Sequence, residues 1–486
     1  MNYKQIFNAV LYLVMIPITL WSFIFFKLNN DVHIYMGVEY IADKFYPFPY
    51  GFDLAWEIKP IGNRILNWAL YKFATLFVSF DNHVMYAILV KLLVVAIAIG
   101  VAWYFASKLK YEYIFPLVLV ALFAIGTISE MQPEWWAAVI GLLIVALLHN
   151  DDKYSHFVVG LLFVAIGLLK GITGLLFIPI LCAAYLLTTD YRRWNLLSIC
   201  AGFSVASISF FILNATIWNH MLSDMFMSST VAHVGFFPWS LVVIKGLSAL
   251  VTSIMQMPVV LSGVFFIVVY IDSQLRKHNI VNVVAFCIMW VAPFVVVVIQ
   301  SELMIYHFYM LVIPAIATII LVSKVNIKSI IIPCVIVFSF CVYFFFLSMF
   351  GVFAATDNDI NNSQINESSF LISKYHLDEQ PSVLYLEHGM APYFFMVNSS
   401  CRYSAPLMLV RNTNYWNISH LKQYQEEYDC VKSYQGEYII LYHDDPIEDW
   451  VGENQSSRAP LMTIIHNNYT VVNNGNWRLL KKNYTP

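Results

Sequence analysis

The sequence predicts a mainly α-helical polytopic membrane protein that ends in a small α/β domain. Of the 486 residues, 60% are hydrophobic and only 12% are charged, whereas soluble domains carry about 25% charged residues. Apolar runs of membrane length recur through residues 1–351. Residues 352–486 are polar and acidic, with 9 Lys or Arg against 15 Asp or Glu. This composition excludes a soluble enzyme, a nucleic-acid-binding protein and a disordered chain.

We expect eleven membrane-spanning helices. The first apolar run is too long for a signal-peptide core and no small-residue cleavage site follows it, so it counts as a span. The eleven spans are expected at residues 6–26, 84–106, 113–128, 135–149, 157–169, 172–187, 195–217, 248–271, 280–298, 306–322 and 329–351.

Loop charges orient these spans. With the N-terminus in the cytoplasm, every inner loop carries basic residues, as the positive-inside rule requires. These residues are Lys4, Lys108, Lys110, Lys153, Arg192, Arg193, Arg276, Lys277, Lys324 and Lys328. An odd number of spans then places residues 352–486 on the outer side.

Residues 64–80 are apolar enough to span, but counting them would invert every later loop. Lys72 lies in the middle of this run, and Asn67, Tyr71 and Thr75 form a polar stripe at helical spacing. An amphipathic helix on the outer membrane surface explains both features. The first outer loop then covers residues 27–83.

The C-terminal region is expected to be a domain of residues 370–486, joined to the membrane domain 1–351 by a polar linker at 352–369. Segments 382–387, 437–443 and 469–472 have the composition of short strands. Cys401 and Cys430 are the only cysteines of this region. On the outer side of the membrane they are expected to form a disulfide, although two buried free thiols are the alternative.

Ionisable residues at membrane depth are costly and usually serve a function. Those expected on the outer face, with two polar aromatic residues, are Asp31, Glu39, Lys59, Arg64, Glu130, Glu134, Lys170, Tyr306 and His307. Acids and cations on one face suit transfer of a group from a lipid phosphate. The leaving phosphate needs cations near its oxygens, and the incoming hydroxyl needs a carboxylate to accept its proton.

Each residue then receives a role. Asp31 is the first candidate for the catalytic base, and Glu39 is the second. Lys59, Arg64 and Lys170 would bind the donor phosphate. Glu39 and Glu130 would hold acceptor hydroxyls or orient the cations. The remaining candidates for substrate binding are Glu134, Tyr306 and His307.

Structural alternatives stand beside these roles. Asp31 could be a solvated residue at the end of the first span, and Glu39 could line a surface helix. Lys59, Arg64 and Lys170 could extend to lipid headgroups. Glu130 and Glu134 could cap helices next to Pro133. No HxxxH or CxxC pattern occurs, and Asp357-Asn358-Asp359 lies in the expected linker, so neither a metal nor another cofactor is expected.

Taken in order, these outer segments resemble the GT-C superfamily of polyprenyl-phosphate-dependent glycosyltransferases. In that superfamily an Asp follows the first span, then come a surface helix, a K-P motif and a second surface helix. The matching positions are Asp31, residues 34–45, Lys59-Pro60 and residues 64–80. Further matches are Gly167 to Gly171 around Lys170, Tyr306 to Pro314, and, in the C-terminal domain, Gly389, Tyr393 and Arg402-Tyr403. The resemblance adds Arg402 to the expected substrate-binding residues.

Within the superfamily, the single acid after span 1 and the outer C-terminal domain are similar to phage-borne serotype-converting O-antigen glucosyltransferases. That subfamily implies inverting transfer of glucose from undecaprenyl phosphate to a lipid-linked O-antigen on the periplasmic face of the bacterial inner membrane. Branches that transfer aminoarabinose to lipid A or mannose to protein usually carry two adjacent acids and a double proline. This chain has Asp31-Val32 and Pro60-Ile61 instead.

Two rival functions remain open. An O-antigen polymerase also has about a dozen spans, but polymerases tend to carry paired arginines in outer loops, and here Arg192-Arg193 falls inside. A flippase or other transporter of lipid-linked sugars would carry polar residues throughout the bundle midplane, whereas most of the charges here lie near one face.

Overall fold

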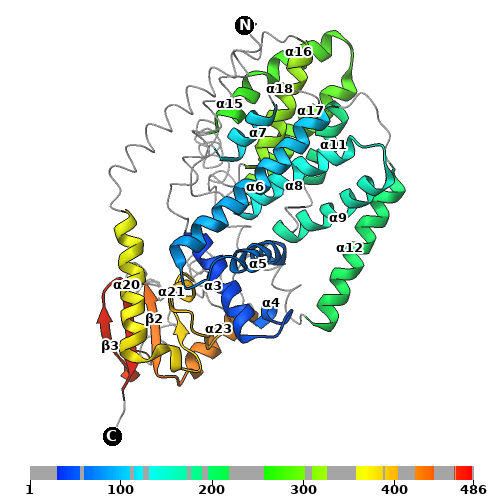
Figure 1. The fold of residues 1–486 in the computed structure, drawn as a ribbon. Coiled ribbons are helices and arrows are strands. Elements are labelled where there is room, and N and C mark those ends of the chain that lie inside the picture. The colour runs from blue at the N-terminus through cyan, green and yellow to red at the C-terminus, as the bar shows by residue number, and fades with distance from the viewer. Residues whose placement is uncertain are drawn as a thin grey trace. The chain divides into compact units, whose positions relative to one another are not determined.

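The computed structural model describes residues 30–54, 60–109, 114–123, 131–171, 174, 177–188, 195–217, 257–300, 309–325, 357–386, 389–402, 422–442, 465 and 467–483. These residues are mostly helical, with one small sheet (Figure 1). They form two compact units. The first takes its described residues from 74–212 and 229–354, and the second takes its residues from 27–73, 213–228 and 355–486.

The first unit consists of apolar helices in the expected order. They are α6 (His83–Leu109), α7 (Ile114–Phe123), α8 (Pro133–Leu148), α9 (Lys153–Lys170), α11 (Phe177–Thr188), α12 (Leu196–Thr216), α15 (Pro258–Phe265), α16 (Ile267–Arg276), α17 (Ile280–Gln300) and α18 (Val312–Val325). Within the described residues, four stretches are long and apolar enough to cross a membrane: Met85–Leu109, Lys153–Lys170, Leu196–Thr216 and Val259–Arg276. The chain is therefore a membrane protein. The spans expected at 6–26 and 329–351 lie outside the described residues.

Small residues bring α9 and α12 into close contact. A Cβ atom on Gly160 would lie 2.1 Å from the Ile199 carbonyl oxygen, and one on Gly202 would lie 2.0 Å from that of Phe157. Close approach through small residues is typical of helices that associate in lipid, where burial of apolar surface gives no driving force.

The second unit begins with three helices of the first outer loop: α3 (Asn30–Phe45), α4 (Gly51–Leu54) and α5 (Ile61–Thr75). Helix α3 starts earlier than the predicted 34–45, so Asp31 lies in its first turn. Within α5, Asn67 and Tyr71 are buried, whereas Ile65 and Phe73 are exposed. The polar stripe of α5 therefore packs inward and an apolar row faces outward, which agrees with a helix on a membrane surface.

The C-terminal part of the second unit is an α/β domain around a four-stranded sheet. The strands are β1 (Leu384–Tyr385), β2 (Tyr438–Tyr442), β3 (Tyr469–Asn474) and β4 (Trp477–Lys482), in the order β1-β2-β4-β3. Strand β1 is parallel to β2, and the other neighbours are antiparallel. The three predicted strand segments correspond to β1, β2 and β3, whereas β4 was not predicted. The remaining elements are α20 (Asp357–Tyr375), η4 (Leu377–Glu379), α21 (Ala391–Phe395) and α23 (Lys422–Ser433).

The predicted linker is wrong for most of its length, because residues from 357 onward form α20. Its polar composition hides a face on which Gln364, Ser368 and Leu371 are buried at helical spacing. Figure 1 shows α20 lying against the sheet, and the Gln364 amide donates to Tyr442 Oη at 2.9 Å. The Asp357-Asn358-Asp359 triplet is the first turn of this helix.

Glu367 fastens α20 to the turn between β3 and β4. Its carboxylate accepts hydrogen bonds from the Asn476 amide N–H at 2.8 Å and from Asn473 Nδ2 at 2.7 Å. Gly475 lies so close that a Cβ atom there would be 2.0 Å from Glu367 Oε1. One acid thus accepts hydrogen bonds from residues on both sides of the turn.

Replacing Glu367 with alanine should destabilise the C-terminal domain by about 1.5–3 kcal/mol, since hydrogen bonds to a charged acceptor would be lost. The measurement is the thermal unfolding midpoint of the purified chain. Asp378→Ala is the matched control, because Asp378 is an exposed acid of the same domain. Equal midpoints for the two variants would contradict the assigned role of Glu367.

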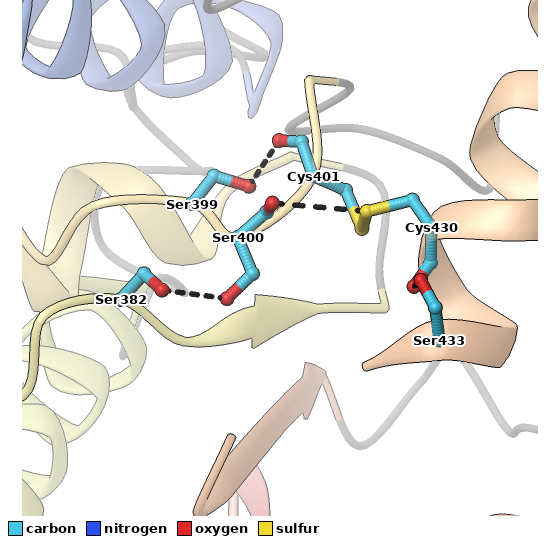
Figure 2. Close-up of a disulfide and its surroundings, with 6 residues drawn as sticks. All are labelled: Ser382, Ser399, Ser400, Cys401, Cys430 and Ser433. Atoms are coloured by element: carbon cyan, nitrogen blue, oxygen red, sulfur yellow. Dashed lines mark hydrogen bonds between the residues drawn. A yellow bond between two sulfur atoms is a disulfide. The ribbon is translucent and has the colours of Figure 1, made fainter. Parts of the chain in front are cut away.

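A disulfide joins Cys401 to Cys430, as the sequence predicts, with a Cα–Cα distance of 5.9 Å and a separation of 29 residues (Figure 2). It links the segment after β1 to α23, and Cys401 belongs to the domain core with Leu384, Ile439 and Leu480. Ser399 Oγ donates to the Cys401 carbonyl at 2.7 Å and holds the chain beside the bond. A disulfide that closes a loop of this length stabilises the folded state by about 2–4 kcal/mol.

Candidate functional site

A buried ion pair joins two helices of the first outer loop. Arg64 Nε donates to Glu39 Oε1 at 2.9 Å, and Arg64 Nη2 donates to Glu39 Oε2 at 3.3 Å. The side chains of Arg64 and Glu39 are 0% and 1% exposed. Because the planar guanidinium matches the carboxylate, this two-point contact fixes the register of α3 against α5.

The third side of the Arg64 guanidinium is also occupied. Nη1 donates to the Phe52 carbonyl oxygen in α4 at 2.7 Å, and the guanidinium lies 5.5 Å from the Phe52 ring centroid. Burial raises the pKa of Glu39, and the Arg64 guanidinium opposes that rise. Arg64 therefore ties together α3, α4 and α5, and in this arrangement it faces protein acceptors at all three nitrogens.

Helix α3 packs against α21 of the C-terminal domain. The His33 ring lies 4.7 Å from the Tyr393 ring and 5.6 Å from the Phe394 ring. One turn later, a Cβ atom on Gly37 would lie 2.5 Å from the Tyr393 backbone nitrogen, so only glycine permits this approach. Burial raises the pKa of the Tyr393 hydroxyl. The turn that carries Asp31 is thus held by the C-terminal domain of its own unit.

A second buried ion pair lies in the first unit. Lys170 Nζ, at the end of α9, contacts Glu134 Oε1, near the start of α8, and both side chains are buried. Gly171 follows with φ 60° and ψ −138°, a backbone conformation that residues other than glycine rarely adopt. The last turn of α9 is therefore shaped to place Lys170 beside an acid within an apolar bundle.

The Leu122 carbonyl oxygen at the end of α7 orders the surroundings of Glu134. It accepts a hydrogen bond from Trp135 Nε1 at 2.9 Å and another from Tyr309 Oη at 3.1 Å. The Trp135 and Tyr309 side chains are fully buried. These two hydrogen bonds fix Trp135, the residue after Glu134, and Tyr309, the first described residue of the segment 309–325.

Arg402 lies in the C-terminal domain, directly after the disulfide-bonded Cys401. Its Nη1 atom is 3.6 Å from Glu426 Oε2 of α23, and both side chains remain partly exposed. An ion pair of this kind contributes about 0–1 kcal/mol, so the contact leaves Arg402 able to exchange partners.

The other predicted site residues are described only in part. Lys59, Glu130, Tyr306 and His307 lie outside the described residues, and Asp31 is described by its helical backbone alone. Within the second unit the structure brings Glu39 to Arg64, and within the first unit it brings Glu134 to Lys170. Among the described residues, no group of three or more His, Cys, Asp or Glu side chains is arranged to hold a metal ion.

Sequence reasoning did not single out His33, Gly37, Phe52 or Asn63. Polar residues recur at every second position in Asp31, His33 and Tyr35, and this spacing gives no helical signal for His33. The rings that His33 contacts, Tyr393 and Phe394, lie about 360 positions later in the chain. Asn63 and Asn67 form an i, i+4 pair, and that spacing could have marked them together.

Protein-family models, curated protein sequences and solved structures were compared with the chain. None of them matches it.

Proposed function

We propose that the chain is an inverting glycosyltransferase that moves a sugar from a polyprenyl phosphate to a glycan. The glucosyl donor undecaprenyl phosphate glucose, an O-antigen acceptor and the periplasmic face of a bacterial inner membrane follow from the resemblance to serotype-converting enzymes. The sequence motifs carry this proposal, and the buried Glu134–Lys170 pair is the structural observation that supports it best.

A lysine and a glutamate among apolar membrane helices are expensive to keep, and such groups are usually retained for a function. Lys170 has the chemistry for a phosphate oxygen, since the ammonium group is a compact charge with three donors. Glu134 keeps that charge compensated while no phosphate is bound. When a donor phosphate binds, it would replace the carboxylate as the partner of Lys170.

The proposed roles of the other residues follow from their contacts. Arg64 and Glu39 satisfy each other, so we assign them to holding the first outer loop in shape. Lys59 and Lys170 remain the candidates for binding phosphate directly. Asp31 remains the candidate base, because Glu39 already accepts two hydrogen bonds from Arg64.

The test is incubation of the purified full chain with undecaprenyl phosphate glucose and a lipid-linked O-antigen. Transfer of glucose to the glycan would support the proposal. Lengthening of the glycan without glucose would identify a polymerase, and movement of lipid across a vesicle membrane without transfer would identify a transporter. Either of these two results would refute the glycosyltransferase.

The proposed topology has eleven spans, a cytoplasmic N-terminus and a periplasmic C-terminal domain. We expect reporter fusions at Asp190 and Asn279 to give cytoplasmic signals, and a fusion at Asn361 to give a periplasmic one, because the inner loops carry the basic residues. A cytoplasmic signal at Asn361 would contradict the outer placement of the C-terminal domain and of its disulfide.

A further inference from the structure

Helix α5 buries two asparagine side chains that have no hydrogen-bond partner. Asn63 and Asn67 are both 0% exposed. The amide oxygen and the amide nitrogen of each residue make no hydrogen bond. Other described asparagines differ from this pair: Asn150 Nδ2, for example, donates to Tyr104 Oη at 3.0 Å and to Ser155 Oγ at 2.8 Å. A buried amide without partners is costly, so the pair requires a partner from outside the chain.

The two amides form one surface, because residues four apart on a helix lie about 5–6 Å apart on the same face. This face adjoins the row that contacts α3, where Arg64 meets Glu39 and the Tyr71 ring lies 6.5 Å from the Tyr40 ring. The opposite side of α5 carries the exposed Ile65 and Phe73. The asparagine pair therefore lies along the flank of the contact with α3, on the side of α5 away from the apolar outer row.

The chemistry of this face selects the ligand. Each carboxamide offers two donors and an acceptor, which suits hydroxyl groups, since a hydroxyl also donates and accepts. The described cation next to Asn63 in the sequence, Arg64, is neutralised by both oxygens of Glu39, so Arg64 offers no free charge to an anion such as phosphate. A neutral, polyhydroxylated group is the ligand that satisfies four amide atoms without bringing charge.

We infer that Asn63 and Asn67 bind hydroxyl groups of the sugar carried by the lipid phosphate. This inference rests on the proposed function, and it assigns recognition of the sugar to a part of the chain that the phosphate-binding residues do not include. Because both amides are closed to solvent, the sugar reaches them only when the groups packed on this face of α5 separate. The amide groups of Asn63 and Asn67, which have no partner in the structure, then form hydrogen bonds with the sugar hydroxyls.

The test compares two probes on the purified full chain: undecaprenyl phosphate glucose and bare undecaprenyl phosphate. The wild-type protein should bind the glucosylated lipid about 10- to 100-fold more tightly, the value of a few net hydrogen bonds. The Asn63→Leu, Asn67→Leu double variant should bind both lipids equally, with affinity for the bare lipid unchanged within about twofold. Its thermal midpoint without ligand should not fall, because leucine removes the unpartnered amides and keeps the branching and the number of side-chain heavy atoms.

Asn150→Leu is the matched control, since the Asn150 amide is hydrogen bonded in the structure. It should lower the thermal midpoint and keep the preference for the glucosylated lipid. A preference retained by the α5 double variant would overturn the inference and leave the proposed function standing. A wild-type protein that binds neither lipid would refute the proposed function together with the inference.

A second measurement needs no variant. Wild-type protein is titrated with lipid phosphates whose glucose lacks one hydroxyl at a time. At least one deoxy sugar should bind about tenfold more weakly than glucose, because it would leave a buried amide group unpaired. Equal affinity for glucose and every deoxy sugar would overturn the inference even if the double variant failed to fold.

Discussion

Replacing Asp31 with asparagine is expected to lower the turnover number for sugar transfer by about 10²–10⁴-fold, the usual contribution of a general base. Asparagine keeps the shape of the side chain and removes its ability to accept the proton of the acceptor hydroxyl. Binding of the donor lipid should change little, because the base acts on the acceptor. The measurement is the rate of glucose transfer at saturating donor, together with the affinity for undecaprenyl phosphate glucose.

Asp43→Asn is the matched control for Asp31→Asn. Asp43 lies on the same helix, α3, and pairs at the surface with Lys72 at 2.8 Å. Its replacement should leave transfer within about twofold of wild type, since an exposed pair contributes about 0–1 kcal/mol. Near-normal turnover of Asp31→Asn would move the base role to Glu39, and full activity of Glu39→Gln as well would refute the proposed mechanism.

If Asp31 is the base of the proposed reaction, its position also makes the C-terminal domain important for that reaction. Asp31 lies in the first turn of α3, where the positive end of the helix dipole favours a carboxylate. That turn is packed through His33 against Tyr393 and Phe394. An acid on a rigid helix can hold its place relative to an acceptor, which is what general base catalysis requires.

The elements that the sequence predicted well are those whose signal is local. The apolar runs behind α6, α9 and α12 are long and strongly hydrophobic, so hydropathy alone locates them. Segments 382–387 and 437–443 are short continuous apolar runs that contain Val, Ile and Tyr, and the structure has β1 and β2 there. The two cysteines of the polar region were expected to pair because they are the only ones there and the region was placed on the outer side, and the structure joins them.

The features that were missed depend on distant partners. Helix α20 was taken for a linker because its sequence is polar, yet Glu367 finds its partners about 110 positions away in the turn after β3. Strand β4 carries Arg478 and two lysines and gains its place by pairing with β2 and β3. Propensity and composition hold no information about such partners.

The candidate site shows the same division. Sequence reasoning gathered acids and cations on one membrane face but could not tell which of them neutralise each other. Glu39 was grouped with Asp31 as an acid, whereas its nearest partner is Arg64, 25 residues later. Lys170 was recognised as unusual for its apolar surroundings, and the identity of its partner, Glu134, came only from the fold.

That partnership leads to the second large prediction, which concerns the charges of Glu134 and Lys170. Glu134→Gln or Lys170→Met alone should destabilise the protein by about 3–5 kcal/mol, because each leaves one buried charge uncompensated. The double variant removes both charges and should return the thermal midpoint to near the wild-type value, since apolar surroundings suit methionine and a neutral amide better than a lone ion.

Activity separates a structural pair from a functional one. If Lys170 stabilises the leaving phosphate, the double variant should fold well and yet transfer sugar at least about 10²-fold more slowly, the cost of losing one preorganised electrostatic contact. Its affinity for bare undecaprenyl phosphate should fall as well, because the phosphate would lose its cation. If the pair served only the packing of α8 against α9, the double variant would regain activity together with stability.

The surface pair Asp43–Lys72 provides the control cycle for this comparison. Asp43→Asn with Lys72→Met removes the same two charges from an exposed site, where their side chains are 26% and 45% accessible. Stability should change by less than about 1 kcal/mol, and transfer should remain near wild type. A recovered thermal midpoint with lost transfer in the Glu134–Lys170 variant, but not in the Asp43–Lys72 variant, would assign the buried lysine to the chemistry of the donor phosphate. Recovery of both properties would instead reduce the pair to a structural contact and remove the observation that best supports the proposed function.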